Sequence, residues 1–179
     1  AVQHFCQDVG WPDDLDYLLI DMPPGTGDVQ MGLAEMLPRA EMVIITTPAL
    51  NAQKVAARVA DMGRKNYLRI VGVIENMTEF VAPDGSRHAL FGAGGGQQLA
   101  DDIGVPLLGS VPIEPIVSAG GDTGEPASLG EGGVADVLRG IATAIAEEYV
   151  PPIEMAGCSA RMLDAAVAAL DQLDLDESA

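Results

Sequence analysis

Aromatic residues are scarce in this chain, where tryptophan, tyrosine and phenylalanine together make up 4% of 179 residues. Hydrophobic residues nevertheless reach 48%, which excludes an intrinsically disordered chain. We therefore expect a globular fold whose core is built from aliphatic side chains. The length is sufficient for one domain with a buried core.

Cysteine is also scarce, since the chain has only Cys6 and Cys158. Their wide separation excludes a disulfide framework and favours a reducing, cytoplasmic environment. No apolar run approaches the length of a membrane span, and no basic-plus-apolar signal segment is present. The chain begins at Ala1 without a methionine, in what reads as the middle of a helix, so we expect further residues upstream.

Basic residues are the third scarcity. Nine lysines and arginines stand against 27 acidic residues, giving a net charge of −18, and the only lysines are Lys54 and Lys65. A surface of this charge repels phosphate backbones and anionic lipids. We therefore expect neither nucleic-acid binding nor membrane binding.

Short apolar runs alternate with amphipathic segments along the chain. This alternation predicts an α/β fold with a mostly parallel sheet and helices on both faces. We expect one domain over residues 1–149 and a C-terminal helical tail over 150–179. Residues 76–91 are predicted to form a loop with a small hairpin near Asp84. Strands are predicted over 15–21, 42–47, 69–75 and 105–111, and helices over 28–37, 51–65, 97–103, 115–119, 134–149 and 160–172.

The segment YLLIDMPPGTGD at residues 17–28 organises the predicted site. A lone carboxylate at the carboxyl end of a buried parallel strand lies where open α/β sheets bind ligands. In a nucleotide hydrolase, Asp21 at this position would hold the water shell of Mg²⁺. Gly25 and Gly27 would let backbone N–H groups approach a γ-phosphate. The alternative is that Asp21 only caps a turn, and Asp28 is a candidate N-cap for the following helix.

Two other phosphate-binding motifs are absent. The loop G-x-x-x-x-G-K-[ST] does not occur, because neither lysine lies in a glycine-rich loop. The glycine cluster at residues 92–96 fails the dinucleotide fingerprint, because Gln97 occupies its last glycine position and a loop precedes it. We interpret this cluster as a flexible entry to a helix.

Several motifs together resemble one known family. They are LLIDMPPGTGD (18–28), TTP (46–48), GVIENM (72–77), FGAGGG (91–96), VPLLGSVPIEP (105–115) and GGD (120–122). Over residues 1–148 the chain resembles the Mrp/ApbC family of P-loop ATPases, kin of MinD and ParA that are described as iron–sulfur cluster carriers. The resemblance implies a P-loop NTPase fold whose first strands and phosphate loop lie upstream of Ala1.

The resemblance also implies roles for individual residues. Asp21 matches the Walker B aspartate that holds Mg²⁺ through water, and residues 23–27, including Gly25 and Gly27, match the switch that senses the γ-phosphate of ATP. Asn76 matches the asparagine whose amide reads the adenine edge, a task suited to a group with both a donor and an acceptor. Without the family context, an Asn closing a turn is the alternative. Pro112 and Ile113 match the segment beside the base.

One family feature is missing. Members that carry a [4Fe-4S] cluster place Cys-Pro-x-Cys after ENM, where this chain reads Ala82-Pro83-Asp84-Gly85. Thiolates hold such clusters, so we identify no iron–sulfur ligands here. We expect His88 to be solvent-exposed, and Cys158 to be a small apolar residue and not a ligand.

The function expected from these residues is that of an Mrp-type ATPase. The intact protein would be a cytoplasmic homodimer that hydrolyses Mg·ATP and acts in iron–sulfur cluster assembly or delivery to apo-proteins. The fragment alone is expected to be inactive and to bind ATP weakly. One alternative is a nucleotide-switched scaffold ATPase that carries no cluster, and another is a ParA/MinD-like positioning ATPase.

Overall fold

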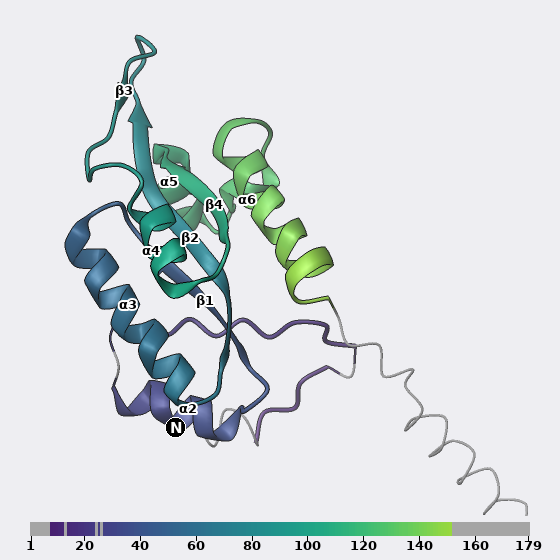
Figure 1. The fold of residues 1–179 in the computed structure, drawn as a ribbon. Coiled ribbons are helices and arrows are strands. Elements are labelled where there is room, and N and C mark those ends of the chain that lie inside the picture. The colour runs from purple at the N-terminus through teal and green to yellow at the C-terminus, as the bar shows by residue number, and fades with distance from the viewer. Residues whose placement is uncertain (1–7, 13, 24, 26, 152–179) are drawn as a thin grey trace, which may run out of the picture.

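The computed structural model describes residues 8–12, 14–23, 25 and 27–151, and it shows one open sheet with helices on both faces (Figure 1). The strands over residues 41–46 and 107–113 are short and rich in aliphatic residues, as parallel strands usually are. The described elements are α2 (Asp28–Met36), β1 (Glu41–Thr46), α3 (Leu50–Lys65), β2 (Arg69–Val81), β3 (Arg87–His88), α4 (Gly95–Ile103), β4 (Leu107–Ile113), α5 (Pro115–Thr123), the 3₁₀ turn η1 (Ala127–Leu129), α6 (Gly133–Ala144) and the π-helical turn η2 (Ile145–Tyr149).

Strand β2 is the centre of the sheet, because β1, β3 and β4 all pair with it. Strands β1 and β4 run parallel to β2, and Val73 pairs with Leu107 of β4. The short β3 pairs antiparallel with β2, and Phe80 lies opposite His88. Helices α3 and α4 provide the crossovers between the parallel strands, as parallel pairing requires. The predicted α/β fold with a mostly parallel sheet is confirmed.

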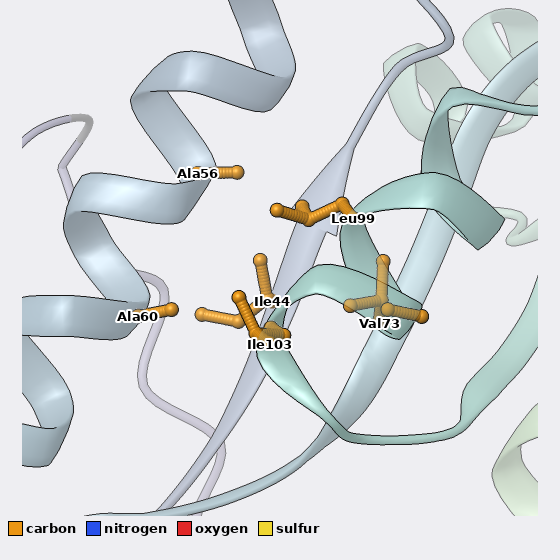
Figure 2. Packing of buried hydrophobic residues seen from close by; sticks show 7 residues of the cluster. Ile44, Ala56, Ala60, Val73, Leu99 and Ile103 are labelled. Atoms are coloured by element: carbon orange, nitrogen blue, oxygen red, sulfur yellow. The ribbon is translucent and has the colours of Figure 1, made fainter.

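Two aliphatic clusters cover the two faces of the sheet. On one face, α3 and α4 pack over β1 and β2, and Val73 is fully buried between them (Figure 2). Ala56 and Ala60 are the residues of α3 in this buried cluster, and Figure 2 shows Ala60 directed toward Ile44 and Ala56 toward Leu99. On the other face, Val134 and Ile141 of α6 pack on Val111 of β4. The aliphatic core expected from the composition is therefore present in the described residues.

The strand predicted over residues 15–21 is wrong. This segment has no regular secondary structure and no ladder partner among the described residues, and 91% of Leu19 is exposed. A side chain anchors it to the end of the described chain, because the Tyr17 hydroxyl donates to the carbonyl of Val150 at 2.7 Å and lies 3.4 Å from the carbonyl of Ala146. An apolar run becomes a strand only where a neighbour accepts its N–H and C=O groups. The nearby strand β1 forms an open edge of the described sheet, where Ile45 is 56% exposed.

The loop predicted from residue 76 is wrong in its first part, because β2 continues to Val81. Phe80 pairs both with His88 of β3 and with Ile113 of β4, which extends the ladder past the irregular backbone at Met77, where φ is 59°. The hairpin expected near Asp84 is confirmed. Gly85 has φ of 83°, which favours glycine, and donates its N–H to Ala82 at 2.9 Å.

One predicted helix start differs from the structure by one residue, and some predictions concern residues outside the described ranges. Helix α2 has Gly27 at its N-cap and not Asp28, which is the first residue of the helix. The helix predicted over 160–172 and both cysteines lie outside the described residues. The domain boundary at residue 149 stays a prediction, although η2 ends at Tyr149. Within the described ranges, none of the helices combines the length and apolarity needed to cross a bilayer.

Candidate functional site

A cleft of about 580 Å³ runs along the whole of β1, from Met42 near its amino end to Thr47 just past its carboxyl end. The loop before α2, strand β1, the inner face of α3 and Asn76 of β2, which is level with the carboxyl end of β1, supply its walls. Its volume is that of a typical small-molecule site. The lining residues are Ile20, Asp21, Met22, Pro23, Gly25, Gln30, Met42, Val43, Ile44, Ile45, Thr46, Thr47, Ala52, Val55, Ala56, Val59, Met62 and Asn76.

Asp21 and Asn76 line this same cleft, although 54 positions separate them in the chain. Asp21 lies just before the proline- and glycine-containing loop that leads to α2, and it is exposed. Asn76 lies on β2, and its Oδ1 accepts the N–H of Met77 at 2.8 Å. The described backbone thus brings one carboxylate and one amide to a common crevice.

Of the other predicted site residues, only one lines the cleft. Gly25 lines the cleft with φ of 97°, a conformation that favours glycine. Gly27 is the N-cap of α2 and is not a lining residue. Pro112 and Ile113 lie on β4 and do not line the cleft, but Pro112 follows Val111, the Cα partner of Asn76.

Gln30 is a cleft residue that sequence reasoning missed. It is buried in the first turn of α2, and its Nε2 donates to the carbonyl of Pro23 at 2.6 Å. This bond ties the loop that follows Asp21 to the helix. The sequence DVQMGLAEM gave no clear signal, because Asp28 and Glu35 are polar residues of the same helix. Thr46 and Thr47, noted only as part of a motif, close the end of β1, where the Thr46 hydroxyl donates to the carbonyl of Thr47 at 3.2 Å.

Within the glycine cluster at residues 92–96, Gly95 and Gly96 are tightly packed, which corrects the flexible helix entry that we predicted for these two positions, and residues 92–94 are exposed. The Gly96 N–H donates to Oε1 of Glu75 at 2.6 Å, and Glu75 is buried. A Cβ on Gly96 would lie 2.4 Å from the Cβ of Glu75, and one on Gly95 would lie 2.5 Å from the carbonyl oxygen of Pro48. Glu75 therefore occupies the N-terminus of α4, the position where an anion would otherwise bind.

The tip of the β2–β3 hairpin holds a chain of polar contacts where the cysteine pair of the resembled family would lie. Asp84 Oδ1 accepts the Ser86 N–H at 2.9 Å and the Ser86 hydroxyl at 2.6 Å, and Ser86 Oγ lies 2.9 Å from Nε2 of His88. The hydrogen bonds from Ser86 lower the pKa of Asp84 below its ordinary 3.8. His88 is exposed, as expected.

This hairpin tip does not fit an iron–sulfur cluster. Ala82 and Gly85 carry no thiolate, and a cluster needs thiolate or imidazole ligands in a set. Over the described ranges, no group of three or more His, Cys, Asp or Glu side chains is placed to hold a metal ion.

An open, mostly parallel sheet with helices on both faces and a cleft that reaches the carboxyl end of β1 is the architecture of the doubly wound α/β class, in which nucleotide-binding proteins are common. A family model described as "ParA: NUBPL iron-transfer P-loop NTPase" matches residues 1–146. The chain belongs to this family of P-loop NTPases, as the motifs predicted.

Curated relatives and solved structures agree with this assignment. The chain is 47% identical over 135 residues to an iron-sulfur cluster carrier protein of Mycobacterium leprae, covering 72% of this chain and 35% of the relative. It is 44% identical over 149 residues to the protein of that name from Deinococcus radiodurans, covering 82% of this chain and 42% of the relative. The chain thus spans less than half the length of these relatives.

Among solved structures, a nucleotide-binding protein of Archaeoglobus fulgidus in complex with ADP is similar, with 32% identity and a TM-score of 0.61. That match covers 69% of this chain and 51% of the other. The cell division ATPase MinD of Pyrococcus furiosus has 25% identity and a TM-score of 0.60, covering 74% of this chain and 52% of MinD. The predicted MinD/ParA-like fold is confirmed.

Proposed function

We propose that the cleft residues of this chain supply part of a Mg·ATP site in an iron–sulfur cluster delivery protein. The observation that carries the proposal is the shared cleft, which joins Asp21, Gly25 and Asn76 at the carboxyl ends of the strands. The ADP bound to the Archaeoglobus relative supports a nucleotide as the ligand class. ATP hydrolysis by the whole protein is part of this proposal.

Asp21 would hold Mg²⁺ through its water shell. The residue fits this role because it is a carboxylate in the cleft, and oxygen ligands with retained waters are what Mg²⁺ prefers. When bound, Mg²⁺ neutralises charge on the phosphates of the nucleotide. The following loop, with Gly25 in a positive-φ conformation and Gln30 bonded to Pro23, would bring backbone N–H groups toward the γ-phosphate.

Asn76 would read the adenine edge from β2, level with the carboxyl end of β1. Its Oδ1 already accepts the Met77 N–H, so the Nδ2 group is the one positioned to donate to a ring nitrogen. Pro112 and Ile113 would pack beside the base, because Pro112 adjoins the β4 residue that pairs with Asn76. Gly27 would act only by fixing the start of α2.

We propose that the phosphate-binding loop lies in a part of the protein that corresponds to the region of the relatives that this chain does not span. The residues here contain no glycine–lysine phosphate loop, and α4 has its N-terminus occupied by Glu75. We therefore propose that residues 1–179 bind Mg·ATP weakly and do not hydrolyse it. The whole protein would act as a cytoplasmic homodimer that serves apo iron–sulfur proteins, a role supported by the names of its curated relatives.

A nuclear magnetic resonance titration of the 179-residue chain with Mg·ATP tests the site. We expect backbone shifts confined to the cleft, around Asp21, Thr47 and Asn76, with an affinity weaker than micromolar. Asp21→Asn should abolish the Mg²⁺ dependence while leaving the adenosine-induced shifts at Asn76. Shifts that avoid the cleft, or calorimetry that shows micromolar affinity, would contradict the proposal.

A second candidate function is a nucleotide-switched scaffold that carries no cluster. The hairpin tip favours it, because Ala82 and Gly85 replace the two thiolates and Asp84 is engaged with Ser86. Anaerobic reconstitution followed by iron analysis and visible absorption separates the two functions. A stoichiometric cluster supports the carrier, and its absence supports the scaffold. The control is a variant with Ala82→Cys and Gly85→Cys, which restores the family's ligand pair.

A ParA/MinD-like positioning role on DNA or membrane is disfavoured by the net charge of −18. A gel-shift assay and liposome pelleting at low salt test it. Clear binding in either assay would revive this alternative.

A further inference from the structure

Helix α3 carries an unpaired basic face in a strongly acidic chain. Elsewhere in the described part, Arg69, Arg87 and Arg139 each form an ion pair with a carboxylate, namely Glu41, Glu79 and Asp136. Of the other lysines and arginines there, all except Arg39 lie on α3. Arg64 donates to the carbonyl of Ile103, which leaves Lys54, Arg58 and Lys65 exposed and without an ion pair to any described residue.

These three side chains lie on one side of the helix. Positions 54, 58 and 65 follow the i, i+4, i+11 spacing of a single helical face, and Asp61 is the one acidic residue of α3. We call Lys54, Arg58 and Lys65 the basic face. Figure 1 shows α3 on the outer flank of the sheet, with α2 next to its C-terminal half.

A surface hollow of about 500 Å³ adjoins the basic face. Arg58, Asp61, Lys65 and Asn66 supply its polar lining, and Met31 of α2 and Met62 supply its apolar lining. A ligand that fits here must therefore combine negative charges with apolar side chains. The hollow is separate from the cleft that contains Asp21, and only Met62 belongs to both.

We propose that the acidic C-terminal segment of this chain, residues 171–179, docks on the basic face. Its sequence, DQLDLDESA, contains four carboxylates and no basic residue, and Leu173 and Leu175 alternate with Asp174 and Asp176. This acid–apolar alternation complements the lysines, arginine and methionines of the α3 surface. The inference is independent of nucleotide binding.

The overall charge favours a tethered occupant over one from solution. A net charge of −18 repels an acidic macromolecule that approaches by diffusion, so a separate acidic partner would associate slowly. A segment of the same chain is held near this surface by its covalent connection, which gives it an effective concentration on the order of millimolar and offsets the repulsion. Exposed ion pairs are individually weak, and such a concentration is what lets a few of them produce a populated contact.

Residues 152–170, which connect η2 to the acidic segment, are long enough for that segment to reach α3. Residues 152–170 span up to about 60 Å when extended, and about 40 Å with residues 160–170 helical. The described domain has a diameter of about 40 Å by its length. The segment can therefore pass from the end of η2 to α3 in either state.

Carbodiimide cross-linking tests the contact directly, because Lys54 and Lys65 are the only lysines of the chain. Apart from the terminal amine, every amide cross-link must therefore report on the basic face. At low salt we expect monomeric products that join Lys54 or Lys65 to Asp171, Asp174, Asp176 or Glu177, and we expect them to disappear at high salt. Products without these links overturn the proposal, and links found only in covalent dimers assign the segment to a second copy.

Lysine acetylation rates provide the matched measurement. Neutralising the segment (D171N, D174N, D176N and E177Q together) should raise the acetylation rate of Lys54 and Lys65 roughly three- to tenfold, as expected for the loss of a few exposed ion pairs. The control variant neutralises four exposed acids elsewhere, with D101N, D102N, D122N and E131Q, and removes the same charge. Equal rates in the two variants would show a general charge effect and contradict docking.

Discussion

Replacement of Gly96 by alanine tests how the end of β2 is held in place. In the wild type, the Gly96 N–H donates to the buried carboxylate of Glu75 at 2.6 Å, and Glu75 directly precedes the site residue Asn76. The added Cβ would lie 2.4 Å from the Cβ and 2.9 Å from the Cγ of Glu75. Glu75 must move, and the hydrogen bond at the start of α4 is lost or distorted.

The magnitude follows from three terms. Overpacking costs about 1–3 kcal/mol, and loss of a hydrogen bond to a buried charged group costs about 1.5–3 kcal/mol. Alanine gains at most about 1 kcal/mol over glycine in helix propensity. The free energy of unfolding should therefore fall by about 1.5–6 kcal/mol, which lowers the melting temperature by at least about 3 °C for a chain of this size.

Urea denaturation followed by circular dichroism gives the stability, and Gly140→Ala is the matched control. Gly140 lies within α6, and an added Cβ there meets nothing within 4 Å. The control should be unchanged or stabilised by up to about 1 kcal/mol. If Gly96→Ala proves as stable as Gly140→Ala, the close packing of Gly96 on Glu75 is refuted.

Three further substitutions test the core, the N-terminal segment and the hairpin. Leu99→Ala removes a buried side chain of the α3–α4 cluster and should cost about 2–5 kcal/mol in urea denaturation. Tyr17→Phe removes the hydroxyl that donates to Val150 and should cost about 0.5–1.5 kcal/mol in the same assay. Ser86→Ala removes the hydroxyl, the larger of the two Ser86 hydrogen bonds that lower the pKa of Asp84, and keeps the backbone N–H, so this pKa should rise part of the way toward 3.8 in a carbon-detected titration.

Each of these has its own check. Leu50→Ala is the exposed control for Leu99→Ala, and Tyr67→Phe is the exposed control for Tyr17→Phe. If a control loses as much stability as the variant that it matches, the contact assigned to that variant is contradicted. For Asp84, the folded-state pKa is depressed, so its stabilising hydrogen bonds persist above the ordinary carboxyl pKa and are lost as pH falls through the folded value. An unchanged titration in Ser86→Ala would show that the Ser86 hydroxyl does not lower the pKa of Asp84.

The sequence predicted the parallel elements well because their signals are local. The run at residues 42–47 and the stripe at 51–65 gave β1 and α3 nearly as the structure has them. The same reasoning failed at residues 15–21, because strand formation there depends on a neighbouring strand and not on apolar content alone. It also failed at Met77, where pairing of Phe80 with two strands continues β2 through an irregular backbone.

For the candidate site, the motifs and their order predicted Asp21 and Asn76 as site residues, and both line one cleft. Gln30 was missed because its role is a tertiary hydrogen bond to Pro23, which no spacing reveals. The packed glycines at 95 and 96 were read as flexible because the buried Glu75 opposite them comes from another element.

The central claim is that Asp21 and Asn76 belong to one Mg·nucleotide site, and paramagnetic broadening by Mn²⁺ tests it most directly. With Mn²⁺ replacing Mg²⁺ in millimolar ATP, the account predicts that amide signals broaden around Asp21, Gly25 and Thr47, and that Asp21→Asn removes the effect. Broadening centred on the hairpin tip or on α4, unchanged by Asp21→Asn, would contradict it.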